Sequence, residues 1–174
     1  MDLPKRKPNR LREYDYSTPG AYFLTLCTKN KQCVLGQIVG GGALDAPHMQ
    51  LTNAGKVAYA HILSGNNIPS VTVDKFVIMP NHIHMILFVD DSVCRGPSRA
   101  PAPTNAVIPH FISTFKRFCN RDLDEAIFQR SYHDHVIRSN TDYLKIWQYI
   151  DSNPAKWKED CFYIRQQEED YASY

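Results

Sequence analysis

The chain has 174 residues and a formal net charge of +2, and its 43% hydrophobic and 22% charged residues are an ordinary balance for a globular domain. This length suits one domain with a substantial core. No apolar run approaches the ~20 residues that span a bilayer, and no apolar segment follows the basic N-terminus as in a secretory signal. Five widely spaced cysteines without a Cys-x-x-Cys motif argue against a disulfide scaffold or a zinc ribbon, and they indicate reduced thiols in the cytoplasm.

The first half of the sequence is predicted to consist mainly of strands. Strands are expected at 21–28, 33–39, 48–51 and 71–79. A helix begins near Thr52 or Asn53, before the last of these strands. The corner Pro80-Asn81 then leads into another strand, which carries two histidines in the run MPNHIHMILFV.

The second half is predicted to contain two helices. Residues 92–105 are rich in proline and poor in large apolar groups, so we expect a loop within one domain. A helix is expected from about 106 to 121, because its apolar residues repeat at helical spacing. Residues 126–138 read as extended. A last helix is expected at 140–152, capped by Ser139 or Asn140 and stopped by Asn153-Pro154.

This order of elements, β–α–β–β–α–β and then a helix, indicates an α+β fold. It is typical of a ferredoxin-like sandwich with a central antiparallel sheet. The two middle strands meet at Pro80-Asn81, which places the histidine strand in the interior of the sheet. We divide the chain into a basic N-terminal arm (1–15), a single domain (16–158) and a C-terminal tail (159–174).

Basic side chains gather in two places. One group lies in the N-terminal arm and the other on the helix that precedes the extended segment: Arg6, Lys7, Arg10 and Arg12, and Lys116, Arg117 and Arg121. The common meaning of such clusters is a solvated terminus or a solvated helix face. The alternative is contact with nucleic-acid phosphates, and both remain open on the sequence.

His82 and His84 stand one residue apart in an apolar strand. Side chains alternate between the faces of a strand, so both imidazoles point the same way. Two neutral imidazoles on one face can chelate a divalent metal. The alternative is a pair of polar residues at a strand end beside a Pro-Asn turn.

Tyr149 lies outside the apolar stripe of the last helix. At ~3.6 residues per turn it is roughly 110° from the centre of the stripe. Asn153 is four residues ahead and Lys145 four residues behind, so the three share a flank. The amide oxygen of Asn153 suits Mg²⁺ or Mn²⁺ and could complete a site that two imidazoles leave unfilled. The alternative is a surface tyrosine followed by a capping asparagine.

Together these motifs resemble the HUH superfamily. MPNHIHMIL is similar to its His-hydrophobic-His core, and QRSYHDHVIR…DYLKIWQYIDSNPAKW resembles the C-terminal half of its single-tyrosine transposases. The Tyr-Ile-x-x-Asn-Pro helix and the opening RLREYDYSTPGAYFLTLCT look like the REP-associated tyrosine transposase group. The resemblance covers roughly residues 10–158.

The resemblance implies a function and a set of roles. His82 and His84 become metal ligands, Asn153 the third protein ligand and Tyr149 the nucleophile. The implied reaction is Mg²⁺- or Mn²⁺-dependent cleavage and rejoining of single-stranded or hairpin DNA through a 5′-phosphotyrosine. Lys145 would favour the phenolate or hold phosphate. We expect a monomer or homodimer without membrane partners.

A second His-x-His pair, His133 and His135, offers a rival metal site or a substrate contact. The resemblance gives His135 a supporting role near the active centre, and we keep both residues out of the metal set. A histidine-triad hydrolase is a further alternative, but its third histidine position is Ile86 here. A non-catalytic or domesticated protein that binds single-stranded DNA hairpins through aromatic and basic side chains is the main remaining alternative.

Overall fold

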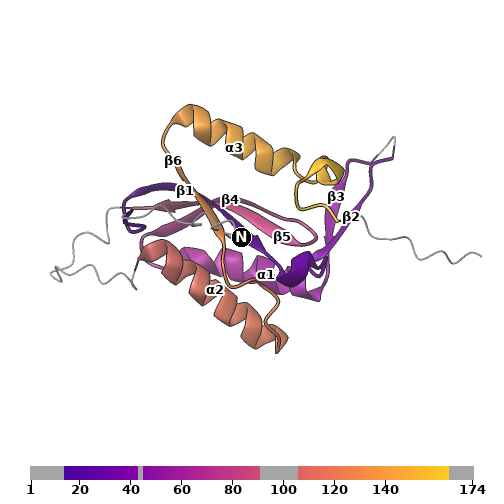
Figure 1. Ribbon diagram of the computed structural model, residues 1–174, viewed down its shortest axis with the longest axis horizontal. Coiled ribbons are helices and arrows are strands. Elements are labelled where there is room, and N and C mark those ends of the chain that lie inside the picture. Colours follow the sequence, from indigo (N-terminus) through magenta and orange to yellow (C-terminus); the bar gives the residue numbers. More distant parts are fainter. Residues whose placement is uncertain (1–13, 43–44, 91–105, 165–174) are drawn as a thin grey trace, which may run out of the picture.

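The computed structural model describes residues 14–42, 45–90 and 106–164 (Figure 1). The basic arm with Arg6, Lys7, Arg10 and Arg12 and the predicted loop at 92–105 lie outside these ranges. The strands are β1 (Gly20–Cys27), β2 (Gly36–Val39), β3 (His48–Leu51), β4 (Val71–Ile78), β5 (His82–Val89) and β6 (His133–Ile137). The helices are α1 (Asn53–Ser64), α2 (Val107–Leu123) and α3 (Asn140–Ser152), with short 3-10 turns η1 (Lys29–Lys31), η2 (Gly65–Asn67) and η4 (Trp157–Glu159).

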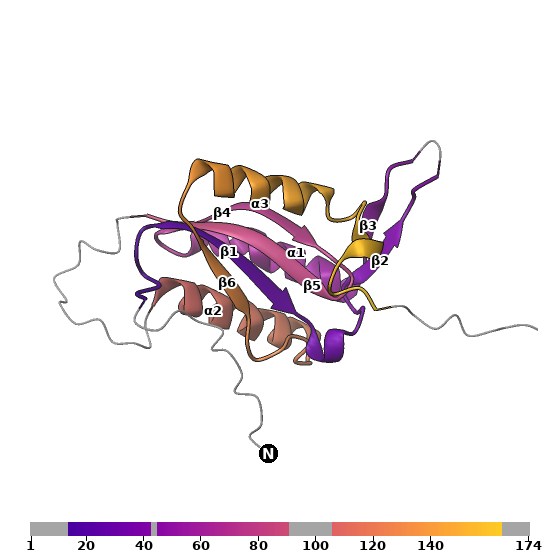
Figure 2. The same cartoon turned by 45° about the horizontal axis from the view of Figure 1, so that its top comes forward.

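The predicted ferredoxin-like sandwich is confirmed. Four strands form one sheet in the order β4-β5-β1-β6, and every neighbouring pair is antiparallel. The histidine strand β5 is therefore interior, as predicted. Helices α1 and α2 cover one face of this sheet and α3 lies over the other (Figure 1). The β2–β3 hairpin forms a separate two-stranded sheet that extends away from the rest (Figure 2).

Two predicted elements differ in extent from the observed ones. The extended segment 126–138 forms a strand only from His133, and before it a single bridge joins Phe128 to Thr28. The backbone before His133 is held by isolated hydrogen bonds, such as the one that Gln129 N donates to Cys27 O over 2.8 Å. The strand expected at 33–39 begins at Gly36. In the described ranges, no helix combines the length and the apolar character needed to cross a bilayer.

Side-chain alternation along β5 separates the core from the histidines. Ile83, Met85 and Leu87 are fully buried in the hydrophobic core, together with apolar residues of β1 and α2. His82 and His84 occupy the intervening positions and therefore face α3. Because a shift of one residue in pairing would exchange the two sets, burial of the core fixes the direction of the histidines.

The start of α1 supports the corner that precedes His82. The Thr52 side chain caps the helix by accepting a hydrogen bond from Gly55 N over 3.2 Å. Leu35 connects this cap to the corner, because its carbonyl accepts from Thr52 N and its N–H donates to Pro80 O over 3.0 Å. A Cβ atom at Gly55 would overlap the Leu35 carbonyl oxygen. Only glycine allows this close approach without moving the chain.

We predict that Gly55→Ala destabilises the protein, although alanine is the better helix former. The added methyl group must displace the Leu35 backbone, and overpacking of this kind costs about 1–3 kcal/mol. Chemical denaturation would measure the loss. Lys56→Ala, at an exposed position of the same helix, is the control and should leave the free energy of unfolding within ~0.5 kcal/mol of wild type. A variant at Gly55 that is as stable as wild type would contradict the close packing.

Candidate active site

The two histidines of β5 lie side by side beneath α3. Their ring centroids are 4.5 Å apart, and His82 and His84 are 0% and 2% exposed. In the sheet His82 lies opposite Cys27, and His84 lies opposite Thr25. The prediction that both imidazoles share one face is confirmed.

Hydrogen bonds fix how the two rings present their nitrogens. The Asn81 amide nitrogen donates to the carbonyls of Lys31 (3.1 Å) and Phe162 (2.8 Å), so its Oδ1 is free to accept from His82 Nδ1 at 2.9 Å. His82 Nε2 then carries a lone pair, and this buried atom has no hydrogen-bond partner. Thr25 Oγ1 lies 2.8 Å from His84 Nδ1. Partners at Nδ1 that leave Nε2 available are the usual support of a metal-binding histidine.

Burial keeps both imidazoles neutral. Desolvation, and in second place the charge of Lys31, lowers the pKa of His82 to about 3. Desolvation, followed by the proximity of His82, lowers the pKa of His84 to about 3 as well. The neutral form of imidazole is the one that binds a metal ion.

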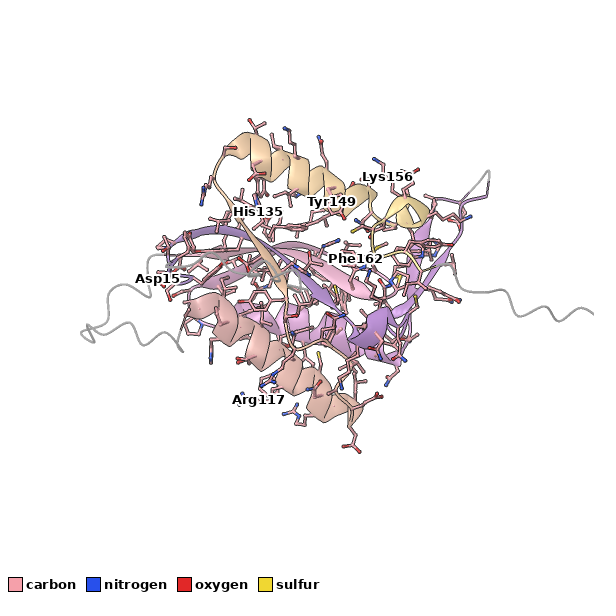
Figure 3. The ribbon with its side chains drawn as sticks, viewed as in Figure 1. Asp15, Arg117, His135, Tyr149, Lys156 and Phe162 are labelled. Carbon is pink, nitrogen blue, oxygen red and sulfur yellow. The ribbon has the colours of Figure 1, made fainter. Side chains whose placement is uncertain are left out.

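Tyr149 lies on the side of α3 that faces the sheet (Figure 3), and it contacts the histidine pair through His84. Its hydroxyl lies 3.2 Å from His84 Nε2, and its ring centroid lies 5.2 Å from the His84 ring. The residue is 41% exposed, so its ring remains accessible from one side. Burial of the hydroxyl raises the pKa of Tyr149 to about 12, and a hydrogen bond with Asn153 opposes this rise. The phenol is therefore neutral at pH 7.

Asn153 follows the last turn of α3 as its C-cap residue, one turn beyond Tyr149. It is 3% exposed, and its Oδ1 atom is buried without a hydrogen-bond partner. An unsatisfied buried amide oxygen is costly unless a ligand completes it. Asn153 therefore adjoins Tyr149, whose hydroxyl lies at His84. The role of Asn153 as a metal ligand stays a prediction.

Asp160 is a member of the site that the sequence prediction missed. Its side chain is 3% exposed, and its Oδ2 atom lies 3.3 Å from the Tyr149 hydroxyl and 4.0 Å from His82 Nε2. Its other oxygen accepts from Phe162 N over 2.7 Å. Ligand atoms of His82, His84 and Asp160 all lie within 4.8 Å of one another. Within the described ranges, they are the one such group of three His, Cys, Asp or Glu residues.

The segment after α3 also covers the histidines with aromatic rings. The Phe162 ring centroid is 4.6 Å from that of His82, and the Trp157 ring centroid is 6.0 Å from it. The available sequence signal was the stop at Pro154, which turns the chain back toward the sheet. The acidic and aromatic residues that follow have no periodicity, so no pattern assigned them to the site.

The two predicted supporting residues lie nearby but do not contact the Tyr149 hydroxyl. His135 is on β6 opposite Phe23, and its Nε2 lies 2.8 Å from an Asp142 carboxylate oxygen. Phe23 in turn packs against the rings of His84 and Tyr149. Lys145 is exposed, and its charge helps to lower the pKa of Asp142 after the larger effect of the His135 hydrogen bond. The supporting roles of His135 and Lys145 stay predictions.

The basic cluster on α2 lies on the opposite side of the sheet from Tyr149 (Figure 3). The Lys116 ammonium donates to the carbonyls of Gln129 (2.6 Å) and Ser131 (3.1 Å), which anchors the segment leading into β6. Arg117 and Arg121 lie over the Phe118 ring, and Arg121 pairs with Asp122 at 2.7 Å. The DNA-binding role expected for Lys116, Arg117 and Arg121 stays a prediction, and the fold does not bring them to the histidine pair.

The fold is similar to that of solved transposase structures. The chain has the fold of a REP-associated tyrosine transposase, whose structure bound to a REP hairpin superposes with a TM-score of 0.61 at 19% identity, over 85% of this chain and 73% of that one. A candidate transposase from Deinococcus radiodurans R1 covers 82% of this chain at 17% identity, with a TM-score of 0.42. No family model matches the sequence.

A protein of Haemophilus influenzae strain Rd, described as uncharacterized, is 33% identical over 177 residues. The alignment covers 91% of this chain and 93% of that protein. The chain therefore belongs to the same family as the Haemophilus influenzae protein.

Acid should destabilise the metal-free protein through the buried histidine pair. Between pH ~6.5 and ~3, the imidazoles of His82 and His84 are protonated in the unfolded chain but stay neutral in the folded protein. The free energy of unfolding should thus fall as the pH drops through this window, by up to ~1.4 kcal/mol per pH unit for each histidine. Denaturation with a chelator at several pH values would measure it. His84→Gln should flatten the dependence, whereas replacement of the exposed His48 by glutamine should not; equal slopes in both variants would contradict the burial.

Proposed function

We propose that the protein is a metal-dependent endonuclease and strand transferase that cleaves single-stranded or hairpin DNA through a 5′-phosphotyrosine intermediate. The observation that carries the proposal is the position of the Tyr149 hydroxyl, 3.2 Å from His84 Nε2 and 3.3 Å from Asp160 Oδ2. A hydroxyl beside a set of ligand atoms is where a nucleophile must lie to attack a phosphate held there.

The side chains of the site fit a divalent cation. His82 Nε2 and Asn153 Oδ1 are buried without partners, so a cation would satisfy both. Imidazole nitrogens with carboxylate and amide oxygens suit Mn²⁺, and the oxygens suit Mg²⁺. His82, His84 and Asp160, with Asn153 beside them, are the residues that would hold the ion. When bound, it would polarise the phosphodiester and neutralise the charge that develops in the transition state.

The protein's own part in the reaction is to supply and orient the nucleophile. The Tyr149 oxygen forms a bond to phosphorus, the bond from phosphorus to the 3′-oxygen breaks, and the DNA keeps a free 3′-hydroxyl. Tyr149 gives up one proton to solvent and the leaving 3′-oxygen takes one up, so protons balance. Attack by another 3′-hydroxyl reverses the step and rejoins strands without an external energy source.

Two observations support an unpaired or hairpin DNA substrate. The fold neighbour is described as bound to a REP hairpin. Tyr149 is partly exposed at the end of a helix and must approach a phosphate closely, which an exposed strand permits more readily than a duplex.

Positive charge near the site would attract the DNA phosphates. It comes from Lys31, which packs on the Phe162 ring at 5.3 Å, and from the exposed Lys156 and Lys158. The N-terminal arm and the α2 cluster are further proposed phosphate contacts.

Removal of the nucleophile gives the most direct test. Tyr149→Phe should reduce DNA cleavage by roughly a thousandfold or more while hairpin binding persists. The assay is a denaturing gel of labelled hairpin DNA incubated with Mn²⁺, in which a covalent adduct migrates with the protein. Tyr143→Phe is the matched control, because that hydroxyl donates to Asp74 on β4 over 2.8 Å and should be dispensable for the chemistry. An adduct formed equally by the Tyr149 variant would remove this residue as the nucleophile.

Asp160 can be tested by metal binding without DNA. Asp160→Asn should weaken Mn²⁺ binding by more than the roughly 10–100-fold that loss of an outer hydrogen-bond partner costs. Calorimetric titration would measure it. Glu159→Gln, which removes the neighbouring exposed carboxylate, should bind as wild type does. If both variants bind Mn²⁺ alike, Asp160 is not a ligand.

A further inference from the structure

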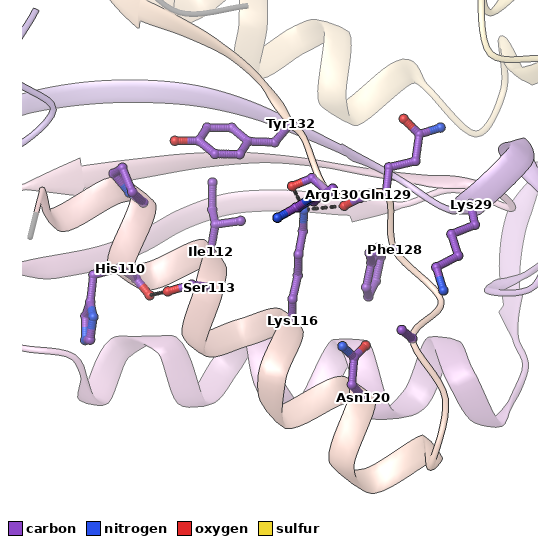
Figure 4. A pocket seen from close by; sticks show the side chains of 12 residues that line it. Lys29, His110, Ile112, Ser113, Lys116, Asn120, Phe128, Gln129, Arg130 and Tyr132 are labelled. Carbon is purple, nitrogen blue, oxygen red and sulfur yellow. Dashed lines mark hydrogen bonds between the residues drawn. The ribbon is translucent and has the colours of Figure 1, made fainter. Parts of the chain in front are cut away.

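Helix α3, which carries Tyr149, rests on the sheet with little apolar burial. Ile150 is the one buried residue of α3, whereas six residues of α2 are buried on the opposite face of the sheet. On that face the contact between the Lys116 ammonium and the Gln129 carbonyl supplements a large apolar interface (Figure 4). Because α3 lacks such an interface, its position on the sheet depends more strongly on polar contacts.

Lys75 of β4 makes two contacts with α3, one on each side of Tyr149 in the sequence. Its ammonium donates to Asp151 Oδ1 over 2.6 Å and lies 3.2 Å from the centroid of the Trp147 ring. The Lys75 side chain is 18% exposed, so solvent and salt screen these contacts less than those of a fully exposed lysine. One cation therefore joins an edge strand of the sheet to two side chains of α3.

A β-bulge in β4 directs Lys75 toward α3. Val73 pairs with Leu87 and Lys75 pairs with Ile86, so Asp74 is an extra residue between two consecutive partners. In regular alternation, Lys75 would share the core face with Val73. The extra residue moves Lys75 to the face that carries the histidines. Bulges of this kind often redirect side chains beside active sites.

The two contacts of Lys75 restrain rotation of α3 about its own axis. At ~100° per residue, Trp147 and Asp151 lie roughly 40° apart on one flank of the helix, and Tyr149 lies roughly 160° from either on the other flank. Side chains extend roughly 6 Å from the helix axis, so a rotation of ~20° would move the Tyr149 hydroxyl by about 2 Å. This hydroxyl lies 3.2 Å from His84 Nε2, so such a movement would separate the two atoms.

We infer that Lys75 is a positioning residue for the proposed nucleophile: by holding Trp147 and Asp151, it fixes the rotation of α3 at which the Tyr149 hydroxyl lies beside His84. The inference rests on the proposed function, because it concerns the placement of Tyr149 for the same reaction. Lys75 acts through the helix, since its contacts with α3 are with Trp147 and Asp151.

Four variants separate this role from a general contribution to stability. Lys75→Met removes the charge and keeps the length of the side chain, whereas Lys75→Arg keeps a cation that can pair with a carboxylate and stack on an indole. Asp151→Asn, at an exposed position, removes the ion pair alone. Tyr143→Phe is the matched control, because it removes a 2.8 Å hydrogen bond between α3 and the neighbouring Asp74, almost two turns before the nucleophile.

The position of Tyr149 can be measured by NMR without DNA or metal. Its ring centroid lies 5.2 Å from that of His84, so its ring current shifts the His84 ring-proton resonances. His84→Gln assigns these resonances, and Tyr149→Ala gives their values without the neighbouring ring. Lys75→Met should move them toward the Tyr149→Ala values, whereas Lys75→Arg and Tyr143→Phe should leave them near wild type. Unchanged resonances in the Lys75→Met protein would overturn the inference.

Single-turnover cleavage of labelled hairpin DNA, at saturating DNA and Mn²⁺, gives the second measurement. A misplacement of ~1 Å can cost about a hundredfold in rate, so Lys75→Met should slow adduct formation by roughly ten- to a hundredfold. Its affinity for the hairpin should stay within about threefold of wild type. Asp151→Asn should slow the reaction by roughly two- to tenfold. Lys75→Arg and Tyr143→Phe should react within about threefold of wild type.

Two results of the cleavage assay would contradict a positioning role. Weaker hairpin binding by Lys75→Met with an unchanged rate at saturation would make Lys75 a phosphate contact. A wild-type rate in Lys75→Met with shifted His84 resonances would show that the reaction does not depend on this placement. Should Lys75→Met fail to fold, the same two measurements on Asp151→Asn decide the matter.

The two measurements also distinguish this inference from the proposed function. If wild type forms no adduct but Lys75→Met shifts the His84 resonances, Lys75 places Tyr149 as inferred and the proposed reaction fails. If wild type forms the adduct and Lys75→Met matches it in rate and resonances, the positioning role fails and the proposed function stands. No adduct from wild type together with unshifted resonances in Lys75→Met would overturn both.

Discussion

The side chain of Asn81 is the contact on which the site depends. Its amide nitrogen donates hydrogen bonds to the carbonyls of Lys31 and Phe162, and its amide oxygen orients the His82 ring through a hydrogen bond with Nδ1. These groups come from three parts of the chain that are far apart in sequence. Because Asn81 is fully buried, each of its polar atoms must be satisfied, and loss of one partner would leave another unpaired. One residue thereby links the direction of the His82 imidazole to the docking of the segment that contains Phe162.

Much of the fold could be predicted from the sequence because its signals are local and periodic. The helix stop at Asn153-Pro154, the cap at Ser139 and the turn at Pro80-Asn81 each fix an element boundary through backbone chemistry. The pairing of His82 with His84 follows from strand geometry alone. The resemblance to single-tyrosine transposases added the order of the motifs, and the observed fold agrees with it.

The parts that were missed arise from tertiary packing. Asp160 enters the site only because the chain turns back after α3, and no local pattern encodes where a short turn docks. The charge of Lys116 is visible in the sequence, whereas the carbonyls that receive its ammonium become visible only in the fold, and its role as a phosphate contact stays a prediction. Tyr149 shows the opposite case. Its departure from the apolar stripe was visible in the sequence, and the structure places its hydroxyl at His84.

The two faces of the sheet carry separate tasks, and this separation bears on how the family can change. Stability resides largely on the side of α1 and α2, where Ile83, Met85 and Leu87 are buried. The residues proposed for chemistry occupy the α3 side, where substitutions disturb few core contacts. A descendant could therefore exchange Tyr149 or Asp160, fold as before and lose the proposed reaction. Retention of this fold among relatives is thus a poor guide to activity, and the side chains beneath α3 are the ones to compare.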